Sequence, residues 1–470
     1  MTNPFQVDSN VWRVIVNRRS ASELLVFESG AGLSLPRVAA PVGTRVAEAL
    51  NRQIAALWNL QVFSLYPLSV PTPPLSGSGT RYHVLESLAP DAAAPRAGSW
   101  LPIGDLREAR FSEPSDFAAV QRWIENLTPR EDRKNRSPFE KPGWLPVLKE
   151  LVQEAIRTIP LTLTGGFLQL NASSAFSLIR FETDGDAVWF KAVGAPNQRE
   201  FALTILLSSL VPSYIPHVLT TQPLWNAWTM LEAPGLRLSE TNDLSVWSNA
   251  ARDLARMQIA CLERTEEILG CPARDTRVNW LCKQVKPFFA ILSELMEGQL
   301  TGAPPRLSPR EVVQLEADTL EALRCLQHEC IPDSLGHLDL NPGNIIAQSD
   351  HTVFLDWAEG SVGHPFFSFA YLLEHFRRIC PGNSQGASRL IQEYAAVWKS
   401  ILPARKTEKT LSVSTFLAVF VHAVSSDTWR DRHALEEPGM AGYYRSLARR
   451  MKHYGDRVRS GVSGVTELWT

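Results

Sequence analysis

The stretch of sequence that decides the fold runs from residue 336 to residue 357 and reads GHLDLNPGNIIAQSDHTVFLDW. Its first half fits the pattern H-x-D-x-x-x-x-N, with His337, Asp339 and Asn344 at the three set positions. The residues between the aspartate and the asparagine include a Pro-Gly pair, which favours a tight turn. We therefore expect the carboxylate and the carboxamide to point into one cleft, and His337 to order the loop by hydrogen bonding.

The second half of this stretch predicts a β-hairpin. Two apolar runs, at 345–346 and 353–355, flank the polar residues Gln-Ser-Asp-His. The hairpin places Asp356, twelve positions after Asn344, beside the loop that carries the asparagine. The alternative interpretation is an ordinary turn, because Asn, Asp, Pro and Gly favour turns for conformational reasons alone.

These side chains are typical of phosphoryl transfer from a nucleotide. In such sites one aspartate accepts the proton of the substrate hydroxyl, while an asparagine and a second aspartate hold Mg²⁺ at the β- and γ-phosphates. Mg²⁺ prefers hard oxygen ligands, which a carboxylate and a carboxamide supply. The spacing therefore predicts Asp339 as the catalytic base, Asn344 and Asp356 as metal ligands, and ATP with Mg²⁺ as cofactors.

A lysine and a glutamate upstream extend this prediction. Kinase-type sites hold the α- and β-phosphates with a lysine from a strand, and a glutamate on a helix positions that lysine. Lys191 ends an apolar strand predicted over 187–193, and Glu200 lies in the first turn of a helix predicted over about 197–210. The alternative is an exposed lysine at a strand end and a glutamate that complements the helix dipole.

Composition and charge set bounds on the class of protein. The chain has 470 residues, of which 44% are hydrophobic and 20% charged, as expected of a folded protein with more than one domain. Its 47 basic and 49 acidic side chains leave a formal net charge of −2, which does not favour nucleic acid as a partner. The sequence has no leader-like start and no apolar run of about 18 residues, so we expect a cytoplasmic protein with no membrane partner.

Hydrophobic periodicity predicts an α+β protein with several folded parts. Residues 1–127 alternate short strands with a helix and predict a small α+β domain. Residues 128–142 are dense in charge and proline, which is typical of a surface linker. A β-rich small lobe is expected over 143–236, and a mostly helical large lobe that carries the catalytic loop over 237–470.

The segments GHLDLNPGNII and VFLDWAEGSVGHP, which start at residues 336 and 353, carry a family likeness. They resemble the aminoglycoside phosphotransferase and choline kinase superfamily, and the likeness spans roughly residues 137–470. The resemblance implies a two-lobed, protein-kinase-like fold with ATP between the lobes. It also implies the roles given above to the catalytic aspartate, the two metal ligands, the lysine and its glutamate.

The same resemblance implies further contacts with the nucleotide. The turn at 168–174 would cover the phosphates through main-chain amides and the hydroxyl of Ser173 or Ser174. The segment 228–235, which contains Glu232, resembles the hinge whose main-chain groups bind adenine. The structural alternative for this segment is a strand followed by a turn.

The chain departs from the superfamily pattern at three positions. Leu338 replaces a glycine, His364 replaces the aspartate before a proline, and Ser368 replaces the aspartate that braces the catalytic loop. None of these changes removes a core catalytic group. The missing brace nevertheless favours a less rigid loop and weaker turnover.

Residues 1–127 resemble a Nudix domain in outline. The helix of that domain needs the pattern R-E-x-x-E-E, because its glutamates bind Mg²⁺, whereas residues 52–57 read RQIAAL. The resemblance therefore implies a domain that has lost hydrolysis and serves as a scaffold or ligand-binding module. The alternative is an unrelated α+β domain.

Together these patterns predict an ATP- and Mg²⁺-dependent phosphotransferase that moves the γ-phosphate to a hydroxyl of a small molecule. Two alternatives stay open: a catalytically weak, nucleotide-binding regulatory module, or pseudokinase, and an AMP transferase that uses the same cleft. Basic residues at 430, 432 and 445–452 favour an anionic or neutral acceptor, unless they form a solvated helix face. The sequence makes no prediction of the acceptor's identity or of the oligomeric state.

Overall fold

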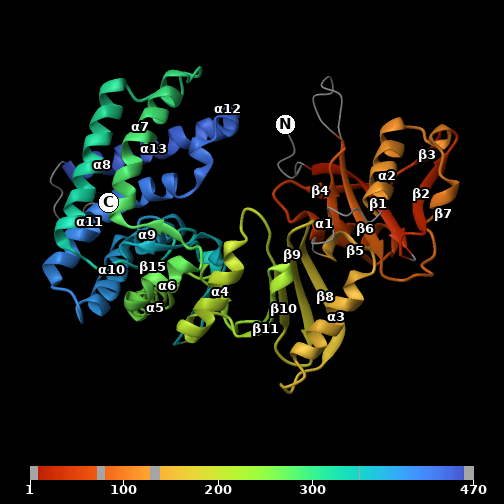
Figure 1. Ribbon diagram of the computed structural model, residues 1–470, viewed down its shortest axis with the longest axis horizontal. Coiled ribbons are helices and arrows are strands. Elements are labelled where there is room, and N and C mark those ends of the chain that lie inside the picture. Colours follow the sequence, from red (N-terminus) through yellow and green to blue (C-terminus); the bar gives the residue numbers. More distant parts are fainter. Residues whose placement is uncertain (1–8, 19, 71–79, 128–137, 349, 460–470) are drawn as a thin grey trace. The chain divides into compact units, whose positions relative to one another are not determined.

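The structure is a computed structural model that describes residues 9–18, 20–70, 80–127, 138–348 and 350–459. It divides into two compact units. The first contains Met1–Phe201 and Val218–Glu232, and the second contains Ala202–His217 and Ala233–Thr470. Both units combine helices and strands, so the predicted α+β class is confirmed (Figure 1).

The N-terminal part of the first unit is a mixed seven-stranded sheet in the order β3-β2-β1-β6-β5, with β4 paired to β1 and β7 to β2. Only β1 and β6 run parallel among these pairs. Helix α1 (Val46–Trp58) packs on one face of this sheet, and helix α2 (Pro114–Leu127) packs on the opposite face. The strands are β1 (Ser9–Arg18), β2 (Glu23–Ser29), β3 (Gly32–Ser34), β4 (Arg37–Pro41), β5 (Val62–Leu68), β6 (Arg81–Ser87) and β7 (Gly98–Pro102).

The small lobe is an antiparallel five-stranded sheet in the order β11-β12-β10-β9-β8. Helix α3 (Trp144–Ala155) precedes it, and α4 (Arg199–Leu210) follows its third strand. The strand predicted over 187–193 and the helix predicted over about 197–210 correspond to β10 and α4. The strands are β8 (Leu163–Ala172), β9 (Ser177–Thr183), β10 (Val188–Ala192), β11 (Val218–Gln222) and β12 (Ala227–Leu231).

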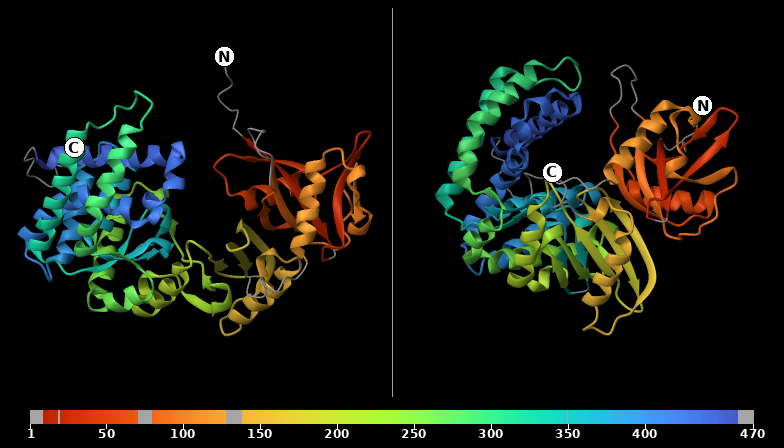
Figure 2. Two further views of the ribbon diagram at one scale, coloured as in Figure 1. Left: turned by 45° about the horizontal axis from the view of Figure 1, so that its top comes forward. Right: turned by 45° about the vertical axis from the view of Figure 1, so that its right-hand side comes forward.

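The N-terminal sheet and the small-lobe sheet adjoin within the first unit, and both views of Figure 2 show the contact. The buried amide of Gln169 on β8 accepts from the Ser64 N–H and donates to the Ser64 carbonyl, each at 2.8 Å. Its oxygen also accepts from Asn51 on α1 at 2.9 Å. Phe139, which falls in the segment expected to be a surface linker, is fully buried and packs on Trp144. Residues 128–137 of that segment lie outside the described residues.

The second unit consists mainly of helices. It also contains two three-stranded sheets, whose strands flank the predicted catalytic loop. One sheet joins β13 (Leu236–Arg237), β16 (Ile345–Ala347) and β17 (Thr352–Phe354), and the other joins β14 (Arg274–Thr276), β18 (Gly360–Gly363) and β15 (Ser334–His337). The predicted hairpin at 345–355 is therefore present. The helices are α5 (Leu244–Ala260), α6 (Thr265–Gly270), α7 (Val278–Glu297), α8 (Pro309–Glu329), α9 (Phe366–Ile379), α10 (Ser384–Trp398), α11 (Ala404–Ser425), α12 (Arg432–Glu436) and α13 (Pro438–Arg459).

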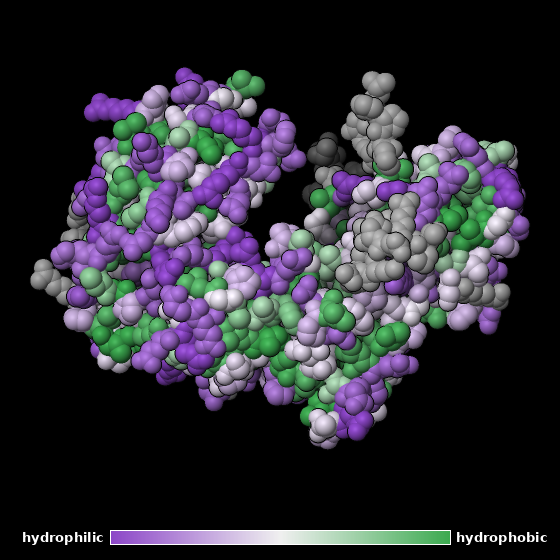
Figure 3. Space-filling view, in the orientation of Figure 1, coloured by the Kyte–Doolittle hydropathy of each residue, from purple (hydrophilic) through white to green (hydrophobic). Residues whose placement is uncertain are grey.

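Helices α7, α8 and α13 pack side by side around one apolar cluster (Figures 1 and 2). Helix α7 lies within the lobe expected to be mostly helical, and Pro287 lies inside this helix. Hydrophilic residues predominate on the face of these helices that Figure 3 shows, in purple. Across the parts of the chain that the structure describes, no helix combines the length and the apolar character that crossing a bilayer requires.

Candidate active site

The catalytic loop starts where β15 ends, at the fully buried His337. The main-chain N–H of Asp339 donates to Nδ1 of this histidine at 3.2 Å, so Nε2 carries the proton and donates to the Leu355 carbonyl at 3.0 Å. Burial lowers the pKa of His337, which keeps the ring neutral. The predicted role of His337 in ordering the loop is confirmed.

Two amide side chains hold the Asp339 carboxylate. Asn344 Nδ2 lies 3.3 Å from Oδ2 and 3.1 Å from the main-chain oxygen of Asp339. Asn341 Nδ2 lies 3.2 Å from Oδ1, while its own oxygen accepts from the Gly343 N–H at 2.9 Å. Asn341 was not singled out from the sequence, although it occupies the loop. Its Asx turn fixes the carboxylate in one orientation.

The hairpin ties Asn344 to Asp356, as the spacing predicted. The N–H of Leu355 donates to the Asn344 carbonyl at 2.8 Å, directly before Asp356. Asp356 has φ +64° and ψ +62°, in the left-handed region. Such a conformation is uncommon outside glycine and concentrates at functional sites.

The donor atoms near this hairpin suit Mg²⁺, because a carboxylate and a carboxamide both offer hard oxygens. Among the described residues no cluster of three or more His, Cys, Asp or Glu could hold a metal ion unaided. A Mg²⁺ ion held by Asp356 and Asn344 would therefore take its other ligands from phosphate and water.

In the small lobe the structure brings the predicted lysine and glutamate together. Lys191 Nζ on β10 donates to Oε1 of Glu200 in the first turn of α4. The side chains are 18% and 2% exposed, so the pair is largely shielded from water. Lys191 also lies 5.8 Å from the centre of the Trp228 ring on the neighbouring strand.

The predicted phosphate-covering turn lies later than expected. Residues up to Ala172 belong to β8, so the turn comprises only 173–176. The Ser173 hydroxyl oxygen accepts from the Phe176 N–H at 2.9 Å and from the Ala175 N–H at 3.2 Å. This leaves the Ser173 O–H proton available to a ligand. Ser174 is exposed at the tip.

Glu232, expected at the adenine hinge, holds strands together with its side chain. Its carboxylate accepts from Arg180 at 2.8 and 2.7 Å and from the Trp189 indole at 3.1 Å. The hydrogen bonds from Arg180 lower the pKa of Glu232. Its N–H donates to the Ala187 carbonyl at 2.8 Å, so this main-chain donor is already used within the protein.

Ser368 braces the catalytic loop. The sequence had predicted that a serine in place of the usual aspartate would leave this loop without a brace. The hydroxyl of this buried serine accepts from the His337 N–H at 2.8 Å. The N–H of Leu338 donates to the Glu359 carbonyl at 3.0 Å, so the loop is anchored on both sides of its histidine. The expectation of an unbraced loop was wrong, because a hydroxyl oxygen serves here as the acceptor.

Four aromatic and imidazole side chains on the helices near Asp339 form a cluster that the sequence did not reveal. Tyr371 stacks with His422 at 5.8 Å and meets His375 edge-on at 4.8 Å between ring centres. His422 Nε2 lies 2.6 Å from the hydroxyl of Tyr443. Burial raises the pKa of Tyr371 to about 12, and the negative charge of Asp339 adds to the rise. We call these four residues the aromatic cluster.

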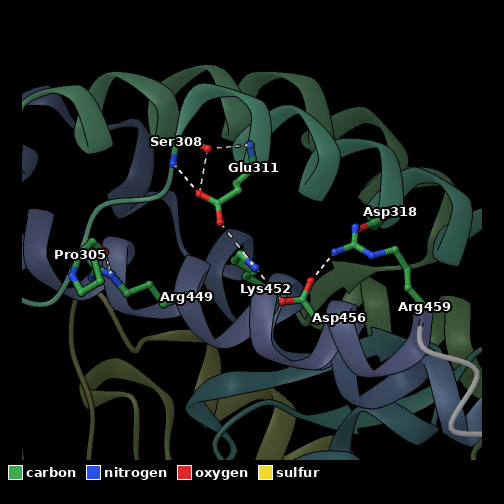
Figure 4. A network of polar contacts seen from close by, with 8 residues as sticks. All are labelled: Pro305, Ser308, Glu311, Asp318, Arg449, Lys452, Asp456 and Arg459. Carbon is green, nitrogen blue, oxygen red and sulfur yellow. Dashed lines mark hydrogen bonds and ion pairs between the residues drawn. The ribbon is translucent and has the colours of Figure 1, made fainter.

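The basic residues near the C-terminus mainly hold helices together. Arg449 donates to the Pro305 carbonyl at 2.8 Å, and Lys452 bonds Asp456 at 2.7 Å and reaches Glu311 at 3.6 Å (Figure 4). Arg459 pairs with Asp318 on α8 in the same network. Arg450 meets Glu374 on α9 at 2.6 Å. Arg449, Arg450 and Lys452 thus have protein partners, which agrees with the alternative of a basic helix face, and an anionic or neutral acceptor stays a prediction.

The β-rich small lobe with its buried Lys-Glu pair and the braced H-x-D-x-x-x-x-N loop are features expected of the two-lobed, kinase-like fold. The model of the APH family, described as the phosphotransferase enzyme family, matches residues 271–402. This match contains the catalytic loop, the hairpin and helix α9, and it confirms the predicted resemblance for that part of the chain. A comparison with curated proteins finds no match.

Several solved structures of small-molecule kinases are similar to the chain at low identity. Ethanolamine kinase from Plasmodium vivax is 13% identical, with 70% of this chain and 93% of that chain covered and a TM-score of 0.45. Choline kinase from Cryptosporidium parvum is 11% identical, with 68% and 100% covered and a TM-score of 0.45. Macrolide 2'-phosphotransferase MphH from Brachybacterium faecium is 16% identical, with 63% and 99% covered and a TM-score of 0.41.

Proposed function

We propose that the protein is an ATP- and Mg²⁺-dependent phosphotransferase that moves the γ-phosphate of ATP to a hydroxyl of a small molecule. The observation that carries the proposal is the geometry of Asp339. Its carboxylate is held by Asn341 and Asn344, and Asn344 is tied through Leu355 to Asp356. One loop and one hairpin would thus present the proposed base and the two proposed metal ligands together.

In the proposed reaction, Asp339 accepts the hydrogen bond of the acceptor hydroxyl and takes its proton as the new O–P bond forms. The bond between the γ-phosphorus and the β-γ bridging oxygen breaks, and ADP leaves with the electron pair. Bound Mg²⁺ would neutralise the charge on the phosphates. Asn344 and Asp356 would hold the ion, and Lys191, positioned by Glu200, would bind the α- and β-phosphates.

The phosphate-covering turn and the hinge complete the proposed nucleotide contacts. The Ser173 O–H and the amides of the turn at 173–176 would donate to phosphate oxygens. The carbonyl of Glu232 would accept from the adenine amino group. The Ser173 O–H and the Glu232 carbonyl are not used in the hydrogen bonds found within the described part of the first unit.

The test is an ATP-dependent screen of a metabolite extract with mass-spectrometric detection. Phosphoryl transfer adds about 80 daltons to one acceptor and releases ADP, whereas AMP transfer adds about 329 daltons and releases pyrophosphate. We expect the smaller shift with the wild-type chain and none with Asp339→Asn. Binding of Mg·ATP with no mass shift in any extract would instead support the regulatory module, and the larger shift would support the AMP transferase.

Asp339→Asn is the matched variant because asparagine keeps the size of the side chain and removes its negative charge. Unchanged far-UV circular dichroism and an unchanged melting temperature would show that the fold is intact. Turnover by Asp339→Asn within about threefold of wild type would contradict the role of this carboxylate as the base, since general base catalysis contributes about 10²- to 10⁴-fold.

A further inference from the structure

A cavity in the first unit lies outside the predicted catalytic machinery of Asp339, Asn344 and Asp356. Its volume is about 500 Å³, and its walls come from β1, β6, the start of α1 and the turn between β8 and β9. Trp12, Arg45, His83 and Ser173 are among the residues that line it. The cavity therefore joins the N-terminal domain to the turn that is expected to cover the ATP phosphates.

His83, in the wall of this cavity, is a polar residue without a hydrogen-bond partner among the described residues. The residue is 1% exposed, and neither of its ring nitrogens has a hydrogen-bond partner within the described part of the chain. Burial lowers the pKa of His83 to about 3, so the neutral ring offers one N–H donor and one acceptor at pH 7. A buried polar group without a partner destabilises the folded protein. A ligand that bonds the imidazole removes this destabilisation.

The start of α1 forms part of the same cavity wall, and its first turn also carries the carboxylate of Glu48. This helix has 13 residues, and its N-cap residue, Arg45, makes no capping hydrogen bond with its side chain. The first-turn amides therefore lack a side-chain acceptor at the positive end of the helix dipole, and Val46 and Ala47 of this turn line the cavity. Arg45 is exposed and forms no ion pair among the residues that the structure describes. A second guanidinium, that of Arg81, lies 5.8 Å from the Trp12 ring.

We propose that this cavity is a binding site for a phosphate-bearing small molecule. The phosphate oxygens would accept from the first-turn amides of α1 and from the Arg45 guanidinium, as anions do at helix N-termini. The His83 N–H would donate to the same molecule, and the Trp12 ring would form an apolar wall. The site is separate from the proposed catalytic loop and does not depend on phosphoryl transfer.

A ligand in the cavity should change the hydrogen bonding of the turn at residues 173–176. The Ser173 O–H, which that turn leaves free to donate, can reach a ligand in the cavity or a phosphate of ATP, but not both at once. The cavity ligand would therefore change the affinity for ATP, a consequence that rests on the proposed function. By reciprocity ATP would change the affinity for the cavity ligand by the same factor.

The first test is hydrogen–deuterium exchange of the full chain with inorganic phosphate in Mg²⁺-free buffer. We expect phosphate to slow exchange in peptides covering 43–50 and 171–176. Arg45→Ala should raise the half-saturating phosphate concentration about tenfold or more, because a charge-assisted hydrogen bond is lost. Arg52→Ala is the matched control, since Arg52 is exposed on the same helix and does not line the cavity.

Other outcomes separate this site from the catalytic one. Protection confined to peptides covering 337–356 would overturn the proposal, because phosphate would then bind only at the catalytic loop. An equal half-saturating phosphate concentration in wild type and Arg45→Ala would also overturn the proposal. His83→Leu should weaken phosphate binding too, and Arg45→Ala keeps the test decisive if the leucine variant does not fold.

The second test measures the dissociation constant of ATP with and without saturating phosphate. We expect phosphate to change this constant more in wild type than in Arg45→Ala. If phosphate changes the dissociation constant of ATP equally in the two proteins, the coupling through Ser173 is wrong. The hydrogen–deuterium exchange experiment would still decide whether the cavity binds phosphate. A chain that shows cavity protection but no ATP binding would count against the proposed function alone.

Discussion

The hydroxyl of Ser368 on α9 accepts a hydrogen bond of 2.8 Å from the main-chain N–H of His337. The bond links two positions 31 residues apart and is fully buried. An ideal Cβ on the preceding residue, Gly336, would lie 3.3 Å from the same oxygen, so the chain passes the serine closely. A small side chain with an oxygen acceptor is what this contact requires.

We expect Ser368→Ala to lower the free energy of unfolding by about 1–3 kcal/mol, because the buried His337 N–H loses its acceptor. The turnover number should fall more than the affinity for ATP, since the loop that carries Asp339 loses its brace. Urea unfolding followed by tryptophan fluorescence, together with kinetics, checks both effects. Ser400→Ala is the control, because Ser400 is exposed and its change should alter stability by less than about 0.5 kcal/mol.

The buried pair of Lys191 and Glu200 can be tested with a double-mutant cycle. Lys191→Met and Glu200→Gln should each lower stability, because each leaves a partner charge in a shielded place, at a cost of up to about 3–5 kcal/mol. The double variant should recover part of that stability yet bind ATP at least about tenfold more weakly than wild type. Calorimetry of ATP binding and urea unfolding provide the measurements.

Lys399→Met is the control for this cycle, since Lys399 is exposed at the end of α10. It should leave both stability and ATP binding unchanged. ATP binding by Lys191→Met equal to that of wild type would contradict the phosphate-binding role of the lysine.

His364 should make the protein sensitive to mild acid. Burial lowers its pKa from 6.5 to about 3, so between these values the unfolded chain binds a proton that the folded chain does not. The stability contributed by the neutral ring is present above pH 6.5 and is lost as the pH falls toward 3. The variant His364→Asn keeps an acceptor for the Phe366 N–H. When the pH is lowered from about 7 to 5, its free energy of unfolding should fall by about 1–2 kcal/mol less than that of wild type.

Urea unfolding at the two pH values measures this difference. His433→Asn should behave as wild type, because the His433 side chain is 96% exposed. An identical acid response of wild type and His364→Asn would show that other groups cause the loss of stability.

The aromatic cluster on α9, α11 and α13 is expected to contact the acceptor rather than ATP. The charge of Asp339 affects the pKa values of Tyr371, His375 and His422 alike, which places all three near the carboxylate that we predict to be the catalytic base. His375 Nε2 is buried and has no partner among the described residues. His375→Ala should therefore raise KM for the acceptor found in the extract screen about tenfold and change KM for ATP less than about twofold.

His453→Ala on α13 serves as the control, because His453 is exposed. Steady-state kinetics with each substrate varied in turn separates the two constants. An equal rise in both KM values would indicate a general structural effect of His375 and would count against acceptor contact.

Local spacing explains which parts of the site were predictable. His337, Asp339 and Asn344 lie within eight residues, and the hairpin that delivers Asp356 follows directly, so short-range turn chemistry positions them. Lys191 and Glu200 were identifiable because a strand and the next helix in the chain carry them. The exact course of helix α7 is harder to predict from local sequence, because Pro287 lies inside it and helix interiors usually exclude proline.

The sequence by itself determined the catalytic loop and its hairpin, because hydrogen bonds between residues a few positions apart form them. Only the tertiary structure decided that Ser368 braces the loop, that Gln169 joins the small lobe to the N-terminal sheet, and that the aromatic cluster gathers near Asp339. These contacts connect residues that are distant in the chain, and no local periodicity encodes which of them meet. Packing of separate helices and sheets selects those partners, and with them the expected acceptor contacts and the cavity beside His83.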